Sequence, residues 1–438
     1  MHNLFGTDGI REKVRTFPVT SEDFIRLGKA IAAFATQTQS NPTFVIGYDT
    51  RISSSFLASC IETGLLHYTI ELTSVDVCTT PLLFLTTQES FDYGIMVTAS
   101  HNTYDYNGVK IFKKNDGKLS LKDELAISEL FYKNDFLTSY AGIKEIDYAA
   151  NPYDNYFEAI DKKKSLSDIF DDIALVIDGA NGAICRETLT FLENFDIDVT
   201  EINTDPDGKN INKHCGVLHP EALQKTVLAE KADIGVAFDG DGDRLCIVSK
   251  DGIIKDGDDI LAFLLTHHPV YKKSQAVVGT VMSNQGLQKY VESLGKKFYR
   301  TPVGDKNVIQ KMNECGALIG AEPSGHVILK DFLPTSDAFF TFIQLVRTAQ
   351  LIGDFTFPSF TKFPHTLVNV PVAAKKDLSL SPFVDIIQQH EKALGAGRLV
   401  VRYSGTEPLL RIMVEAETQA QSDMISQTLS LQLTNALL

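Results

Sequence analysis

The sequence predicts an α/β protein of four domains, in which three related α/β domains precede a smaller C-terminal α+β domain. Three observations support this fold class. Short β-rich runs alternate with segments of helical period, a weak internal repeat returns three times, and the last part of the chain has a different pattern. A chain of 438 residues is also too long for a single hydrophobic core.

The β-rich runs are expected to be strands of mainly parallel sheets, because each is short and helical segments separate them. They cover residues 43–49, 173–179, 233–240, 276–282 and 317–322. The segment 21–36 is predicted to be a helix, and Thr20 with Asp23 resembles a capping box at its start. Its apolar residues share one face: Phe24, Leu27, Ile31 and Phe34.

The internal repeat consists of two kinds of strand followed by a loop. In the first kind an apolar strand opens into a small polar loop, as in VIGYDTR, VIDGANG and VGTVMSN. In the second kind a later strand opens into a richer loop, as in VTASHN, VAFDGDGDR and IGAEPSGH. Ligands of α/β proteins bind at such strand ends, so these loops are the candidate functional segments.

The domain boundaries are predicted from linker-like composition. A proline and the charged run DKKKSLSD lie near the first junction, KDGIIKDGDD near the second and TFPSFTKFPHT near the third. The predicted domains are residues 1–150, 151–252, 253–364 and 365–438. In the last domain, LVVRYSGTEPLLRIMVEAE is expected to form two strands around a turn, followed by a helix from residue 419.

Composition and charge restrict the classes of function. The net charge of −15 argues against a nucleic-acid-binding face. The six cysteines form no CxxC pair, which is typical of free thiols in a reducing compartment. No signal-peptide pattern opens the chain, and no apolar run approaches the roughly 20 residues of a membrane span. We therefore expect a cytoplasmic protein that binds no membrane.

The loop DGDGDR places Asp239, Asp241 and Asp243 at alternate positions with glycines between them. Three converging carboxylates repel one another unless a cation lies among them, and oxygen ligands favour Mg²⁺ or Ca²⁺. An EF-hand is excluded because Arg244 and Lys250 occupy the positions of its glycine and its final glutamate. A solvated acidic turn is the alternative, but turns rarely contain three aspartates.

Two further loops carry groups suited to a sugar phosphate. Ser404, Gly405 and Thr406, with Arg402 and Arg411 beside them, offer donors to a phosphate, although Ser-Gly-Thr is also common in turns. In AEPSGH, the side chains that can bind sugar hydroxyls are Glu322 and Ser324, with His326 near them. Each loop by itself is a weak signal. No Walker A pattern is present.

Ser100 follows an apolar strand and precedes His101, which suggests a hydrolase dyad. That interpretation is weak, because neighbouring residues on an extended strand point in opposite directions and no G-x-S-x-G elbow is present. With a metal loop, a phosphate loop and Lys110 in the same chain, a better hypothesis is that Ser100 Oγ carries a phosphoryl group.

The four loops together resemble the α-D-phosphohexomutase family, and the similarity extends over essentially the whole chain. The family's motifs occur in order: TASHN at 98–102, DGDGDR at 239–244, AEPSGH at 321–326 and SGTEP at 404–408. Within the family the chain is most similar to the phosphoglucosamine mutases, on the stretches FGTDGIR, PDGKNINKHCGVLHPE, TVMSNQGL and RTPVGDK.

This resemblance implies a heart-shaped molecule with a central cleft, in which the four domains carry the phosphoserine, metal, sugar and phosphate loops in that order. It implies interconversion of glucosamine 6-phosphate and glucosamine 1-phosphate through phosphorylated Ser100 and a sugar 1,6-bisphosphate, by a monomer or a homodimer. One Mg²⁺ would be held by Ser100 and the three aspartates. Arg11, Lys110 and His101 are implied as catalytic residues, and Arg244 as support for the phosphoryl group.

The resemblance also implies that Glu322, Ser324 and His326 bind the sugar, and that the phosphate loop with Arg402 and Arg411 binds the distal phosphate. Pro323 departs from the phosphoglucosamine mutases, and the order DYNG is closer to phosphomannomutase/phosphoglucomutase relatives. The alternative function is therefore the same reaction on neutral hexose phosphates. A non-catalytic sugar-phosphate binding protein and a phosphatase are further alternatives.

Overall fold

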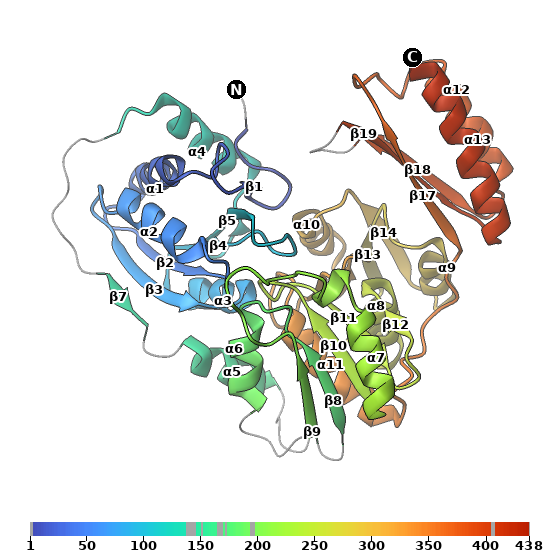
Figure 1. Ribbon diagram of the computed structural model, residues 1–438, viewed down its shortest axis with the longest axis horizontal. Helices are drawn as coiled ribbons and strands as arrows, with labels where there is room; N and C mark the ends of the chain where they lie inside the picture. The colour runs from blue at the N-terminus through green and yellow to red at the C-terminus, as the bar shows by residue number, and fades with distance from the viewer. Residues whose placement is uncertain are drawn as a thin grey trace.

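The computed structural model describes residues 3–136, 146–149, 152–163, 170, 173–192, 198–403 and 408–437. Its helices and strands form four units, each built on one sheet, that follow one another around the molecule (Figure 1). Ser404, Gly405 and Thr406 lie outside the described residues.

The first unit is a seven-stranded sheet of order β1-β5-β4-β2-β3-β7, with β6 paired to β5. Its strands are β1 Ile10–Lys13, β2 Thr43–Tyr48, β3 Glu71–Val77, β4 Tyr93–Val97, β5 Tyr106–Lys113, β6 Gly117–Lys118 and β7 Asp147–Tyr148. Its helices are α1 Ser21–Thr36, α2 Ser54–Leu65, α3 Thr80–Ser90 and α4 Leu121–Lys133. The strands β4, β2, β3 and β7 are parallel, whereas β5 runs antiparallel to both β4 and β1.

The second unit has the strand order β12-β11-β10-β8-β9. Its elements are α5 Pro152–Lys163, β8 Ala174–Asp178, α6 Ile184–Leu192, β9 Asp198–Ile202, α7 Glu221–Glu230, β10 Ile234–Phe238, β11 Leu245–Ser249 and β12 Ile254–Lys255. The strands β9, β8 and β10 are parallel, and β11 is antiparallel to β10. In this unit, as in the first, an antiparallel strand therefore lies next to the last of the parallel strands.

The third unit has the order β14-β13-β15-β16, with β14, β13 and β15 parallel and β16 antiparallel. Its elements are α8 Gly257–His267, β13 Ala276–Thr280, α9 Gln285–Ser293, β14 Lys297–Thr301, α10 Asp305–Cys315, β15 Ile319–Ala321, β16 Val327–Leu329 and α11 Ala338–Ile352. Three mixed, mainly parallel sheets of one pattern are what the internal repeat predicted.

The fourth unit is smaller and its sheet is antiparallel, in the order β17-β19-β18. Its elements are β17 His365–Pro371, α12 Phe383–Ala393, β18 Arg398–Tyr403, β19 Leu409–Glu415 and α13 Gln419–Leu437. The sequence prediction of two strands followed by a helix from residue 419 is confirmed.

Local signals explain where α1 begins and which face it buries. The hydroxyl of Thr20 accepts the backbone N–H of Asp23 at 3.1 Å and donates to the Asp23 carboxylate at 2.6 Å. Phe24, Leu27 and Ile31 are buried as the helical period predicted, and Phe34 is half-buried.

One hydrophobic core runs through the first three units. It includes Phe84 and Phe112 from the first, Phe238 from the second, and Phe339 and Phe342 from the third. The fourth unit has a core of its own, formed by residues of β17, β18, β19, α12 and α13. The shared core holds the first three units in one arrangement, whereas the fourth unit is joined by a linker and polar contacts.

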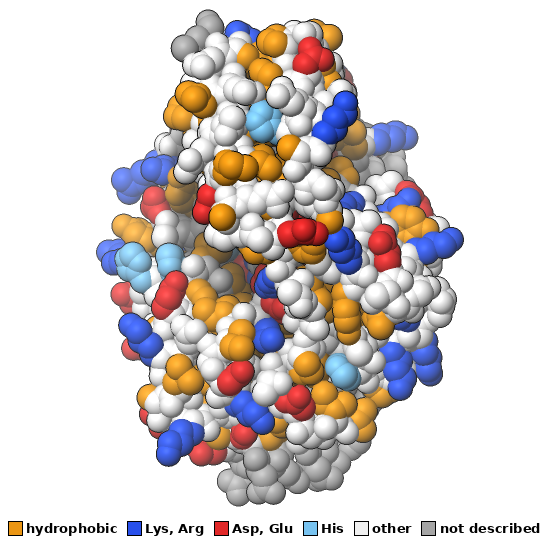
Figure 2. All heavy atoms as spheres, turned by 90° about the vertical axis from the view of Figure 1, so that its right-hand side faces the viewer, with side chains coloured by type: hydrophobic (Ala, Val, Ile, Leu, Met, Phe, Trp, Pro, Cys, Tyr) orange, Lys and Arg blue, Asp and Glu red, His pale blue; other side chains and the backbone are white. Residues whose placement is uncertain are grey.

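The surface is hollowed beneath the C-terminal unit, which forms the upper part of the molecule in Figure 2. Among the helices in the described part of the chain, none combines the length and apolar character needed to cross a lipid bilayer.

Candidate active site

The candidate site is built from loops that occupy the same position in each of the first three sheets. Each loop joins the last parallel strand to the antiparallel strand beside it: β4 to β5, β10 to β11, and β15 to β16. These loops contain Ser100, the three aspartates and the AEPSGH segment respectively. Equivalent loops meet because the three sheets share one core.

Ser100 is fully buried and contacts the aspartate loop of the second unit. Its backbone has the left-handed φ of +52°, which is uncommon for a residue with a side chain. Its N–H donates to Thr98 Oγ1 at 2.8 Å, and its Oγ donates to Asp239 Oδ2 at 2.8 Å. The serine is therefore neither a helix cap nor a surface turn residue, because its hydroxyl is buried and donates to a carboxylate of the second unit.

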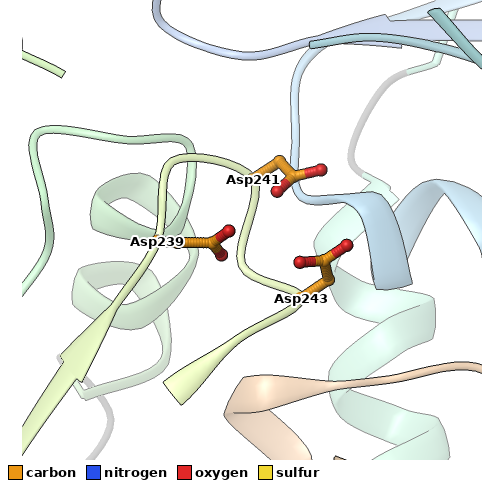
Figure 3. Close-up of side chains that lie close together, drawn as sticks. All are labelled: Asp239, Asp241 and Asp243. Atoms are coloured by element: carbon orange, nitrogen blue, oxygen red, sulfur yellow. The ribbon is translucent and has the colours of Figure 1, made fainter. Parts of the chain in front are cut away.

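Asp239, Asp241 and Asp243 converge from one loop, as Figure 3 shows, with ligand oxygens within 4.8 Å of one another. Gly240 is required because a Cβ there would lie 2.8 Å from the carbonyl oxygen of Ser100, and Gly242 has a φ of +71°. The Oδ1 atom of Asp241 is buried and has no hydrogen-bond partner among the described residues. A hard divalent cation would satisfy this atom, so the triad fits a metal.

The electrostatics of the triad also favour a cation. Burial, with Asp243 and Asp241 adding to it, raises the pKa of Asp239 to about 7. Burial would also raise the pKa of Asp243, but Lys110 and His326 hold that pKa well below its ordinary value. The protein surroundings thus disfavour the charged form of Asp239 and stabilise that of Asp243.

Lys110 and Arg11 supply positive charge next to the triad. Lys110 Nζ lies 2.7 Å from Asp241 Oδ2 and 2.5 Å from Asp243 Oδ2. Burial would lower the pKa of Lys110, but Asp241, Asp243 and Asp8 raise it well above its usual value. Arg11 is held by an ion pair with Asp8. In this arrangement both side chains are positively charged groups rather than bases.

Asp8 is a site residue that sequence reasoning did not single out. Its carboxylate pairs with Arg11, lies 3.4 Å from Lys110 Nζ, and binds Lys118, which in turn binds Asp305 of α10 at 2.6 Å. It therefore connects the charges of the site with the third unit. The run FGTDGIR contains this residue, but nothing local indicates that its carboxylate faces two distant lysines.

His101 lies beside Ser100, with Nδ1 at 3.4 Å from the serine Oγ. Burial, together with the positive charges of Arg244 and Arg11, lowers the pKa of His101 to about 2. Its imidazole is therefore neutral at pH 7 and a very weak base.

Glu322 and His326 form a buried pair next to the aspartate loop. His326 Nδ1 lies 2.8 Å from Glu322 Oε2, and the other oxygen of Glu322 accepts the N–H of Gly304. His326 Nε2 lies 3.2 Å from Asp243 and 3.1 Å from the Nε of Arg244. Burial and Arg244 lower the pKa of His326, but Asp243 and Glu322 outweigh them and raise it to about 9.

Arg244 belongs to the aspartate loop and donates its backbone N–H to Asp239 at 3.1 Å. Ser324, in the loop that carries Glu322 and His326, is exposed. The loop thus presents one free hydroxyl side chain to solvent while Glu322 is engaged within the protein.

Arg51 is a second residue whose importance the sequence did not reveal, since an arginine beside a turn is usually a surface charge. Its side chain is completely buried and pairs with Asp49 at 2.8 Å. Its guanidinium also donates to backbone carbonyls of the Ser100 loop. The motif DTR contains no signal for this role, which depends on the folded loop.

Arg402 and Arg411 lie apart from this cluster, opposite each other on β18 and β19. They line a cavity of about 270 Å³ with Met282, Leu367, Asn369, Val400, Ile412 and Met413. Burial and the neighbouring Arg411 lower the pKa of Arg402, as expected for two cations on adjacent strands. The phosphate-loop residues Ser404, Gly405 and Thr406, between the two strands, lie outside the described residues.

Comparison with family models matches all four units to one family. The models are described as phosphoglucomutase/phosphomannomutase alpha/beta/alpha domain I, domain II, domain III and C-terminal domain, and match residues 2–138, 154–252, 256–354 and 367–429. The chain belongs to the phosphoglucomutase/phosphomannomutase family.

Relatives cover nearly the whole chain. Phosphoglucosamine mutase of Sphingopyxis alaskensis is 37% identical over 97% of this chain and 97% of its own length. Phosphoglucosamine mutase of Solibacter usitatus is 37% identical over 98% and 97% respectively. The structure of Aspergillus fumigatus N-acetylphosphoglucosamine mutase in complex with GlcNAc-6P and magnesium has a TM-score of 0.69 at 16% identity, and covers 99% of this chain and 96% of that one. That similarity concerns the fold.

Proposed function

We propose that this protein is an isomerase that interconverts glucosamine 6-phosphate and glucosamine 1-phosphate. The observation that carries the proposal is the 2.8 Å hydrogen bond from Ser100 Oγ to Asp239, which places a buried hydroxyl beside a triad of carboxylates. The relatives named phosphoglucosamine mutase, which align over the whole chain, support the amino sugar as substrate.

In the proposed reaction, Ser100 is phosphorylated in the resting enzyme. The 1-hydroxyl of glucosamine 6-phosphate attacks the phosphorus and loses its proton to a base, while the bond between Ser100 Oγ and phosphorus breaks and Ser100 Oγ takes up a proton. The sugar is now the 1,6-bisphosphate. After the bisphosphate reverses its orientation in the site, Ser100 Oγ attacks the 6-phosphate and loses its proton, and the 6-oxygen takes up a proton. This step releases glucosamine 1-phosphate and restores the phosphoserine.

The charges of the site suit these transfers. Asp239, Asp241, Asp243 and the phosphate of Ser100 would hold one Mg²⁺, which when bound would neutralise charge on the phosphoryl group. Lys110, Arg11 and Arg244 are the fixed cations beside the same group. His101 is the neutral imidazole nearest Ser100 and is proposed to contact the phosphoryl group without taking up the proton, because its low pKa makes it a weak base.

The remaining residues are proposed to hold the substrate. Glu322, Ser324 and His326 would bind sugar hydroxyls, and Arg402, Ser404, Gly405, Thr406 and Arg411 would bind whichever phosphate is not reacting. We assign these roles to domains 253–364 and 365–438, and the phosphoserine and metal loops to domains 1–150 and 151–252. The enzyme is proposed to work in the cytoplasm, as a monomer or a homodimer.

The test is mutase activity with Mg²⁺ on glucosamine 6-phosphate, glucose 6-phosphate and mannose 6-phosphate in parallel, for wild type and Ser100→Ala. A kcat/KM that is highest for the amino sugar and lost in Ser100→Ala supports the proposal. Equal or higher efficiency on the neutral sugars would assign the alternative function and direct attention to Pro323. Inactivity on all three by verifiably phosphorylated protein would reject both.

A further inference from the structure

The loop that carries Ser100 is held by two side chains that donate to the same two carbonyl oxygens. Arg51 Nη2 donates to the carbonyls of Ser100 and Asn102 at 2.9 and 2.8 Å. Asn212 Nδ2 donates to these two carbonyls at 2.8 and 2.9 Å. Arg51 belongs to the first unit, whereas Asn212 belongs to the second. The backbone of the nucleophile is therefore fixed from both sides of a domain interface.

Arg51 uses all the donors that a guanidinium has. Nε donates to Asp49, Nη1 to the carbonyls of Thr103 and Tyr106, and Nη2 to those of Ser100 and Asn102. Because every partner lies in the first unit, Arg51 gives the loop its shape. It does not set the distance between the loop and the aspartates of the second unit.

Asn212 reaches the loop from the strap, which we define as residues 205–216 between β9 and the turn before α7. Its backbone N–H donates to Ala180 O at 2.9 Å, and Gly216 N–H donates to Asp178 at 3.0 Å, so the strap is anchored to the end of β8. Gly208 O accepts the N–H of Ile52 at 2.8 Å, which extends the contact to the first unit. The strap contains most of the stretch PDGKNINKHCGVLHPE, to which the reaction assigns no part.

We propose that Asn212 is a positioning residue that sets the position of Ser100 relative to the aspartate loop, an inference that rests on the proposed function. The amide is buried and bonds the carbonyl of Ser100 itself. Its backbone is anchored to the sheet whose next strand, β10, ends immediately before Asp239. Ser100 Oγ and Asp239 are thus fixed in one frame. A misplacement of about 1 Å at a reacting atom can reduce the rate by about 100-fold.

The experiment compares wild type, Asn212→Ala, Asn212→Asp and the control Asn210→Ala. Asn212→Asp keeps the shape of the side chain but loses the N–H donors. The side chain of Asn210 donates to Asp205 O and accepts Asp207 N–H, both within the strap, so Asn210→Ala removes no bond to the Ser100 loop. The measurements are kcat and KM with glucosamine 6-phosphate, the rate of Ser100 phosphorylation by glucosamine 1,6-bisphosphate followed by mass spectrometry, and amide hydrogen exchange over residues 98–106.

The proposal expects kcat about 100-fold lower in both Asn212 variants, with KM within about twofold of wild type. Ser100 phosphorylation should slow equally, residues 98–106 should exchange faster, and Asn210→Ala should match wild type. The proposal is overturned if both Asn212 variants keep the wild-type kcat and the wild-type rate of Ser100 phosphorylation. It is also overturned if Asn210→Ala loses as much kcat as the Asn212 variants. If wild type fails to convert glucosamine 6-phosphate, the proposed function fails, while the phosphorylation rates still decide the role of Asn212.

Discussion

Lys110 Nζ lies 2.7 Å from Asp241 Oδ2, although the two residues are 131 positions apart in the chain. The same nitrogen bonds Asp243 at 2.5 Å. One buried ammonium group therefore serves two of the three aspartates, while Asp241 Oδ1 keeps no partner among the described residues. This relationship predicts how the triad responds when either cation, lysine or metal, is removed.

Lys110→Met should destabilise the protein in EDTA by about 3–5 kcal/mol, because it leaves buried carboxylates without their cation. Mg²⁺ should then raise Tm by more in the variant than in wild type, since the triad has lost a competing positive charge. Tm with EDTA and with Mg²⁺ measures both effects. Lys113→Met, which removes only a surface pair with Asp116, is the control. Equal Mg²⁺ shifts in wild type and Lys110→Met would contradict the prediction.

Glu322 and Ser324 should behave differently on substitution although they are close in sequence. Glu322→Leu leaves the buried Gly304 N–H and His326 Nδ1 without an acceptor, so the free energy of unfolding should fall by about 1–3 kcal/mol. Ser324→Ala should leave stability unchanged because the residue is exposed. If Ser324 binds the sugar, the KM of Ser324→Ala for the sugar phosphate should rise while kcat stays at the wild-type value. Urea unfolding and steady-state kinetics separate these effects, and unchanged stability in Glu322→Leu would show that the pair contributes little.

Asp337 should make stability depend on pH. Burial raises its pKa to about 7, above the unfolded value of about 3.9, while its carboxylate accepts from Tyr156 and Phe340 N–H. The folded state therefore binds the extra proton between pH 4 and 7, and stability is lost as pH rises through this window. Between pH 4 and 7, the free energy of unfolding of wild type should therefore fall relative to that of Asp337→Asn by at most roughly 1.4 kcal/mol per pH unit.

Denaturant titrations at intervals from pH 4 to 8 measure this difference. Asp385→Asn, at an exposed position of α12, is the matched control and should show no such trend relative to wild type. A stability difference between wild type and Asp337→Asn that is independent of pH would show that Asp337 stays ionised in the folded protein.

Arg398 should control how the C-terminal unit is held. Its guanidinium donates to the carbonyls of Val281 and Ser283 at 2.6 and 2.8 Å and pairs with Glu415. Arg398→Leu removes these bonds, and hydrogen bonds to charged groups contribute about 1.5–3 kcal/mol. If the fourth unit binds the distal phosphate, the KM for the sugar phosphate should therefore rise roughly tenfold.

Small-angle scattering should also report a larger radius of gyration for Arg398→Leu, because the fourth unit shares no core with the others. Lys392→Met, on the exposed side of α12, is the control and should match wild type in both measurements. A compact variant with wild-type KM would mean that the linker alone holds the unit.

Much of the site was predictable because its chemistry is encoded locally. Asp239, Asp241 and Asp243 alternate with glycines in one loop, so their convergence follows from spacing. The strand preceding Ser100 and the helix from residue 419 likewise follow from local apolar patterns. The partners of Lys110, Asp8 and Arg51 were not predictable, since each contact joins segments with no common periodicity.

The sequence by itself determined the α/β class, the repeated strand and loop pattern, and the residue types in each loop, because these depend on the order of neighbouring residues. Only the tertiary structure decided that Arg51 is buried and that Asn212 reaches Ser100 across a domain interface. It also decided that Glu322 is engaged by His326. The burial of Arg51 and the pairing of Glu322 depend on how their loops fold. The contact of Asn212 depends on how the sheets pack around one core, which brings together residues more than a hundred positions apart.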